Sequence, residues 1–96
     1  MSEIKVEKPD KTKLKQLSIP EAPKNTGAWS VWECEPSSFD WQYSDQEVCY
    51  IYEGRVVVKT PKGETKIQAG DLVTFPKGLK CQWQVLDKIR KVYKFE

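Results

Sequence analysis

A two-residue alternation of apolar and polar side chains dominates the chain from residue 28 onward. In AWSVWEC, Trp29 and Val31 fall on one face and Trp32 on the other, while FDWQY places its three aromatic residues together. Such alternation indicates half-buried β-strands. It predicts about eight short strands separated by turns, in AWSVWEC, FDWQY, EVCYIY, RVVVKT, TKIQ, LVTF, KCQWQVL and IRKVYKF. The prediction is an all-β sandwich or barrel.

The first 27 residues follow a different pattern. They are rich in lysine and contain three prolines but no aromatic residue. Asp10 is a suitable N-cap for a short helix in KTKLKQL, where Leu14 and Leu17 fall on one face. We therefore predict an N-terminal arm over residues 1–27, with a strand-like start, one helical turn and an extended lead-in. The arm is expected to pack over a barrel formed by residues 28–96.

The alternation also predicts which side chains face the interior: Phe39, Trp41, Tyr43, Glu47, Cys49, Ile51, Cys81, Trp83 and Val85. Glu47 is the unusual member of this set. A carboxylate among aromatic side chains costs several kcal/mol unless it is paired or hydrogen-bonded. Arg55 and Arg90 are expected to lie outside the barrel.

Composition bears on the partners and kinds of site that can be expected. With 96 residues the chain forms one domain, and its 16 basic and 14 acidic residues give a net charge of +2. The lysines are scattered, so neither nucleic acid nor a membrane is an expected partner. The three cysteines form no C-x-x-C pair and there is no histidine, so no zinc knuckle or disulfide framework follows. No signal peptide or membrane-spanning run is apparent, which predicts a cytoplasmic protein.

Two turn-flanked stretches resemble the motifs of the cupin family, a small β-barrel of the jelly-roll type. Glu47 and Gly54 have the spacing E-x6-G of the first motif, and Gly70, Pro76 and Gly78 keep the frame G-x5-P-x-G of the second. EVCYIYEG, GDLVTFPKG and the terminal RKVY are similar to stretches of the small single-domain cupins related to ureidoglycine aminohydrolase. The resemblance covers roughly residues 28–95. It implies a single jelly-roll barrel, and barrels of this kind commonly pair as homodimers.

The resemblance also implies where a metal would lie. Metal-binding cupins hold Mn, Fe, Ni or Zn with two histidines, a glutamate and a later histidine, which fall here on Trp41, Tyr43, Glu47 and Cys81. A Trp indole cannot act as a ligand. Cys81 and Glu47 would combine a soft and a hard ligand without any imidazole. We therefore expect no metal and no cofactor, with an atypical divalent ion at Glu47 and Cys81 as the disfavoured alternative.

Three hypotheses for function remain open. In the first, a metal-free pocket around Glu47 binds a small polar metabolite, with contacts from Phe39, Trp41, Cys49, Ile51, Trp83 and Tyr93. In the second, the protein is an enzyme that uses Glu47, Tyr43 and Cys81 as acid, base or nucleophile on a ureido or amino substrate. In the third, the barrel is a structural or interaction protein, and its own aromatic side chains fill the interior. Glu47 would then be a structural carboxylate bonded to Tyr43 or to backbone amides.

Overall fold

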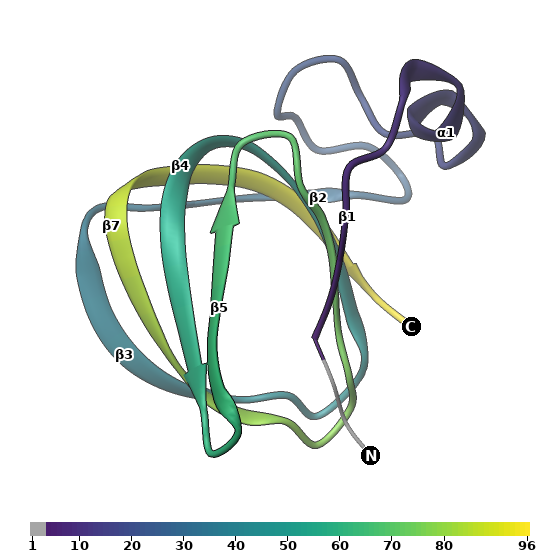
Figure 1. The fold of residues 1–96 in the computed structure, drawn as a ribbon. Coiled ribbons are helices and arrows are strands. Elements are labelled where there is room, and N and C mark those ends of the chain that lie inside the picture. The colour runs from purple at the N-terminus through teal and green to yellow at the C-terminus, as the bar shows by residue number, and fades with distance from the viewer. Residues whose placement is uncertain (1–3) are drawn as a thin grey trace.

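The structure is a computed structural model and describes residues 4–96. Within these residues, one short helix and seven strands follow one another (Figure 1), in the order β1 (Lys5–Glu7), α1 (Lys11–Gln16), β2 (Ser30–Cys34), β3 (Ser37–Gln42), β4 (Glu47–Thr60), β5 (Gly63–Gln68), β6 (Leu72–Phe75) and β7 (Lys80–Phe95). The all-β prediction is confirmed, as is the single helical turn in the N-terminal segment.

Two long strands, β4 and β7, hold the barrel together. They pair antiparallel with each other along most of their length. The first part of β7 also pairs with β3 and its last part with β2, while β4 pairs first with β6 and then with β5. β1 adds to the free edge of β6. Figure 1 shows these strands wrapped around one interior, which is the jelly-roll barrel expected from the sequence.

The prediction of about eight short strands was wrong in one respect. EVCYIY and RVVVKT form the single strand β4, and KCQWQVL and IRKVYKF form the single strand β7. The ladder between β4 and β7 is irregular between Ile51 and Val56, where three register shifts occur. Such bulges bend a strand sharply without ending it. A strand can therefore cross from one half of the barrel to the other at a place where the sequence indicates a break.

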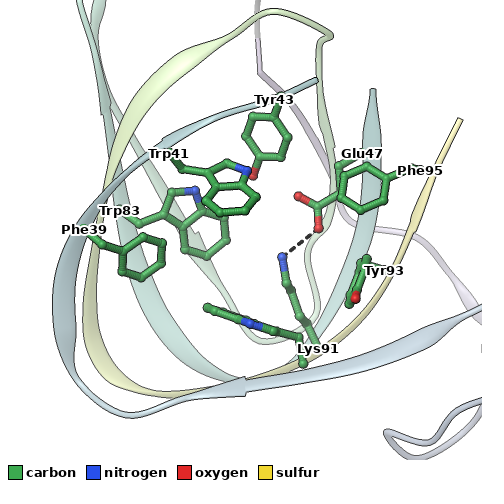
Figure 2. A pocket seen from close by; sticks show the side chains of 9 residues that line it. Phe39, Trp41, Tyr43, Glu47, Trp83, Lys91, Tyr93 and Phe95 are labelled. Carbon is green, nitrogen blue, oxygen red and sulfur yellow. Dashed lines mark hydrogen bonds and ion pairs between the residues drawn. The ribbon is translucent and has the colours of Figure 1, made fainter. Parts of the chain in front are cut away.

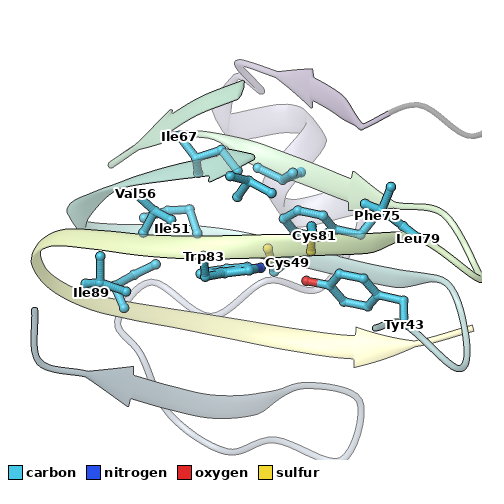
Figure 3. Close-up of a cluster of buried hydrophobic side chains, with 13 residues drawn as sticks. Tyr43, Cys49, Ile51, Val56, Ile67, Phe75, Leu79, Cys81, Trp83 and Ile89 are labelled. Carbon is cyan, nitrogen blue, oxygen red and sulfur yellow. The ribbon is translucent and has the colours of Figure 1, made fainter. Parts of the chain in front are cut away.

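The bulge also reverses which side chains face inward. In the first half of β4 the buried residues are Glu47, Cys49 and Ile51, whereas in the second half they are Val56 and Val58. The interior positions thus change from odd to even numbers across the bend. Along β7 the buried positions from Cys81 to Lys91 are all odd-numbered. The strands together enclose a core of aromatic and branched side chains (Figure 3).

A second, smaller cluster attaches the N-terminal arm to the outside of the barrel. Trp29 is buried there with Ile19, Leu72 and Val92. Leu14 of α1 and Leu17, which directly follows the helix, pack against them. The Trp29 indole N–H donates to the carbonyl of Leu17 at 3.1 Å. The Asp10 side chain accepts a hydrogen bond from the Lys13 amide at 2.9 Å, which confirms the expected N-cap.

Candidate functional site

A cavity of about 220 Å³ opens into one end of the barrel interior. Seven of its nine lining side chains are aromatic, and the other two are Glu47 and Lys91 (Figure 2). The lining residues come from four strands and the loop after β3: Trp32, Phe39, Trp41, Tyr43, Glu47, Trp83, Lys91, Tyr93 and Phe95. The cavity is therefore an aromatic chamber with one pair of opposite charges.

Glu47 and Lys91 form a buried ion pair. The Lys91 ammonium donates a hydrogen bond from Nζ to Glu47 Oε2 at 2.8 Å, and the two side chains are only 6% and 5% exposed. Cross-strand register explains the contact. Lys91 lies opposite Ile51 on β4, and Ile51 shares its inward face with Glu47 four residues earlier. The lysine side chain thus extends through the barrel interior to reach the carboxylate.

Three aromatic rings also lie close to the Lys91 ammonium. Nζ lies 5.0 Å from the ring centroid of Trp32, 4.7 Å from that of Trp83 and 5.6 Å from that of Tyr93. Trp32 is the direct cross-strand partner of Lys91 on β2. Cation–π contacts of this kind stabilise the charged form of an amine whose side chain is buried. One carboxylate and three rings therefore hold a fixed positive charge inside the barrel.

Burial favours the neutral forms of Tyr43, Cys49 and Cys81 near the pair. Burial raises the pKa of the Tyr43 hydroxyl far above its ordinary value, and the charge of nearby Glu47 raises it further. Burial raises the pKa of Cys49 to about 12, partly offset by the positive charge of Lys91. Burial also raises the pKa of Cys81, with the Trp83 indole opposing that shift and Glu47 adding to it. Neither thiol is therefore activated as a nucleophile.

The structure brings together most of the site residues that the sequence suggested. Phe39, Trp83 and Tyr93 line the cavity with Glu47 and Tyr43. Trp41 also lines it, but from the rim, where the side chain is 49% exposed rather than directed into the core. Cys49 and Ile51 lie in the closed core and do not line the cavity. Cys81 also lies outside it, with its thiol donating to the carbonyl of Trp41 at 3.6 Å.

Sequence reasoning missed Lys91, Trp32 and Phe95 as lining residues. A usable signal was present for all three. In IRKVYKF, Lys91 and Phe95 alternate in phase with Tyr93, which was recognised as a candidate. Trp32 falls on the face of its strand opposite to Trp29. A lysine in a strand is normally interpreted as a surface residue, because the sequence does not show which residue on another strand it pairs with.

Comparison of the sequence with models of known protein families identifies the family of this barrel. The model of the EutQ-like cupin domain matches residues 21–93. The chain belongs to this cupin family.

The solved structures of individual proteins have a similar fold. A DUF861 family protein from Thermotoga maritima is 49% identical to this chain in sequence. Its crystal structure matches this one with a TM-score of 0.87, and the match covers 98% of this chain and 100% of that chain. The EutQ protein of Clostridium difficile is 28% identical over 68% of this chain and 52% of its own, with a TM-score of 0.63. A cupin-2 domain protein from Shewanella frigidimarina, at 16% identity and a TM-score of 0.61, shares the fold.

A curated relative is much longer than this chain. The protein named acetate kinase EutQ from Clostridioides difficile is 30% identical over 61 residues. The match takes in 64% of this cupin but only 39% of that relative. Separately, none of the helical residues within 4–96 forms a segment long and apolar enough to cross a membrane.

The donor set of this cupin does not fit a metal ion. Within residues 4–96 no three His, Cys, Asp or Glu side chains come together in a group able to hold one. The place beside the Glu47 carboxylate is taken by the Lys91 ammonium. A metal cation would have to approach that positive charge, and like charges repel each other strongly where the side chains are buried.

The raised pKa of Cys49 gives a simple test of the closed core beside the ion pair. At pH 8 a thiol with a pKa of about 12 is ionised to about one part in ten thousand. We expect a disulfide reagent such as DTNB to label the half-buried Cys34 in the native protein and to leave Cys49 unlabelled. All three thiols should react after unfolding in guanidinium chloride. Rapid native labelling that persists in Cys34→Ser and is lost in Cys49→Ala would contradict this expectation.

Proposed function

We propose that this cupin is a small-molecule-binding protein whose pocket works without a metal. The observation that carries the proposal is the aromatic cavity with the Glu47–Lys91 pair among its walls. Ligand sites in proteins are mostly apolar concavities with a few polar groups that fix orientation. At about 220 Å³ this cavity is smaller than the roughly 300–1,000 Å³ of drug-sized sites. The expected ligand is therefore a small, partly polar metabolite.

On this proposal the cupin is related to the ureidoglycine aminohydrolase-like cupins and departs from them at the metal. Trp41, Tyr43 and Cys81 stand at the positions of the three histidines, while Glu47 is kept. Lys91 then supplies the positive charge beside Glu47 that a metal would supply. The activity in the name of the longer EutQ relative is not carried over, because this chain spans only 39% of that protein.

The other two hypotheses receive less support. An enzyme using Cys81 as nucleophile or Tyr43 as base would need a lowered pKa, whereas burial raises the pKa of both groups. A barrel filled by its own aromatics would leave no cavity beside Glu47, yet one lies there. Binding is the function that remains best supported.

The tryptophans provide the test. Three of them, Trp32, Trp41 and Trp83, line the cavity, whereas Trp29 lies in the separate cluster under the arm. Indole N–H signals of ¹⁵N-labelled protein would be followed while a library of small polar metabolites is added. We expect ligands to shift the three pocket signals and to leave the Trp29 signal in place. Each signal is assigned by replacing one tryptophan with phenylalanine.

The matched control is the double variant Glu47→Gln/Lys91→Met, which removes both charges and keeps similar side-chain volumes. Loss of the ligand-induced shifts in this variant would support the proposal. A library in which no compound moves a pocket signal would refute it. The metal-free part is tested by elemental analysis, where near-stoichiometric Mn, Fe, Ni or Zn that disappears in Glu47→Gln would overturn it.

A further inference from the structure

We infer that the Glu47–Lys91 pair recognises an uncharged, flat molecule whose C=O and N–H groups lie side by side, as they do on the edge of a cyclic amide. This inference rests on the proposed function, because it names the class of ligand that the cavity would bind. It is carried by three features of the cavity: its charge balance, its paired donor and acceptor, and its ring-lined walls.

Charge balance favours an uncharged ligand. Glu47 and Lys91 are the two formally charged side chains among the nine that line the cavity, and they carry opposite signs. Their charges already compensate each other at 2.8 Å. An anionic or cationic ligand would add a third charge among aromatic rings without a counter-charge to match it. Burying an uncompensated charge in this way is strongly unfavourable.

The pair offers one donor and one acceptor next to each other. An ammonium has three N–H donors and a carboxylate has about four acceptor positions. The bond between Lys91 Nζ and Glu47 Oε2 uses one of each. Nζ has no second hydrogen-bond acceptor among residues 4–96, where its other neighbours are rings. A ligand carbonyl can accept from Lys91 while the adjacent ligand N–H donates to Glu47, so both hydrogen bonds involve a charged group.

The walls favour a flat ring over an extended chain. Phe39 and Trp83 lie nearly parallel, with ring centroids 6.0 Å apart and an angle of 14° between their planes. Trp32 stands edge-on to Trp83 at 5.9 Å. Aromatic walls of this kind gain most from a ligand that presents a planar face or edge. Trp41 and Phe95, each about half exposed, flank the entrance.

Four probe compounds separate these features: 2-pyridone, N-methyl-2-pyridone, benzoate and benzylamine. All four contain one planar six-membered ring and are similar in size, but only 2-pyridone carries the adjacent C=O and N–H. Dissociation constants would be measured from the indole N–H shifts of the pocket tryptophans. We expect 2-pyridone to bind at least about tenfold more tightly than N-methyl-2-pyridone, since methylation removes a hydrogen bond to a charged acceptor. Benzoate and benzylamine should bind more weakly than 2-pyridone.

The double variant Glu47→Gln/Lys91→Met is expected to bind 2-pyridone and its N-methyl derivative within about threefold of each other. Equal affinity for these two compounds in the unaltered protein would overturn the inference, as would absence of any 2-pyridone shift. Tighter binding of benzoate or benzylamine at the pocket tryptophans would also overturn it while leaving small-molecule binding intact. If neither the metabolite library nor the probe compounds shifted the signals of the pocket tryptophans, the proposed binding function itself would be refuted.

Discussion

Replacing Lys91 with methionine is expected to lower the free energy of unfolding by about 3–5 kcal/mol, because it leaves the Glu47 carboxylate buried without its partner. A domain of this size has a total stability of roughly 5–15 kcal/mol, so the loss would be visible in any equilibrium measurement. Urea denaturation followed by tryptophan fluorescence gives the value. Glu47→Gln should be destabilising for the reciprocal reason, since it leaves the ammonium unpaired.

The double variant distinguishes a lost pair from a lost side chain. Glu47→Gln/Lys91→Met removes both charges and is expected to recover most of the stability lost in Lys91→Met, because buried ion pairs are often replaceable by uncharged side chains of similar volume. The two single changes should therefore be strongly non-additive, as expected for groups in direct contact.

A surface pair provides the matched control. Arg55 and Asp87 also form an ion pair between β4 and β7, but both side chains are more than half exposed. Arg55→Met should leave the denaturation midpoint nearly unchanged, since exposed pairs contribute little. If Lys91→Met were as mild as Arg55→Met, the Glu47 carboxylate would have to be solvated, and the buried pair would be ruled out.

Replacing Gly54 with alanine is expected to destabilise the protein by about 3–5 kcal/mol or to prevent folding. Gly54 has a φ of +103°, a conformation that L-residues rarely adopt. An added Cβ would also lie 2.5 Å from the carbonyl oxygen of Lys88 and 2.7 Å from the Cα of Ile89. Backbone atoms of β7 cannot move aside cheaply, so strain and overpacking act together. Circular dichroism and urea denaturation of the purified variant would measure the effect.

Two other glycines allow the effect of backbone strain to be separated from that of overpacking. Gly70 has a φ of +91° but no atom within 4 Å of an added Cβ, so Gly70→Ala should show the backbone strain alone, about 1–3 kcal/mol. Gly27 has neither feature, and Gly27→Ala should be nearly neutral. A Gly54→Ala variant no less stable than Gly70→Ala would show that β4 and β7 do not approach as closely as described.

Much of the fold could be predicted from local pattern. Period-two alternation identified the strands, and the N-cap Asp10 with Leu14 and Leu17 identified the helix and the side that packs against the barrel. The spacing of Glu47 with Gly54 indicated the cupin frame, and Gly54 occupies the bend of β4. These features depend on residues close together in the chain, where side-chain direction follows from backbone geometry alone.

The joined strands and the ion pair could not be predicted in this way. At the bend of β4 a bulge keeps the strand continuous, although the local pattern around Glu53 and Arg55 indicates a break. The partner of Glu47 lies 44 residues away. The alternation of IRKVYKF places Lys91 in phase with Tyr93, but it does not show which residue Lys91 pairs with. Tyr43 or backbone amides are the structural partners that the sequence suggests for Glu47, whereas its charged partner in the structure is Lys91.

The sequence by itself determined the all-β class, the cupin frame and the inward position of one carboxylate. It did so because strand alternation and turn residues act over a few neighbouring positions. Only the tertiary structure decided what that carboxylate faces. Antiparallel pairing of β4 with β7 brings Lys91 beside Glu47, and pairing of β7 with β2 places Trp32 against the same ammonium. The character of the site thus comes from contacts between strands distant in the chain, whose register is set by the packed barrel as a whole.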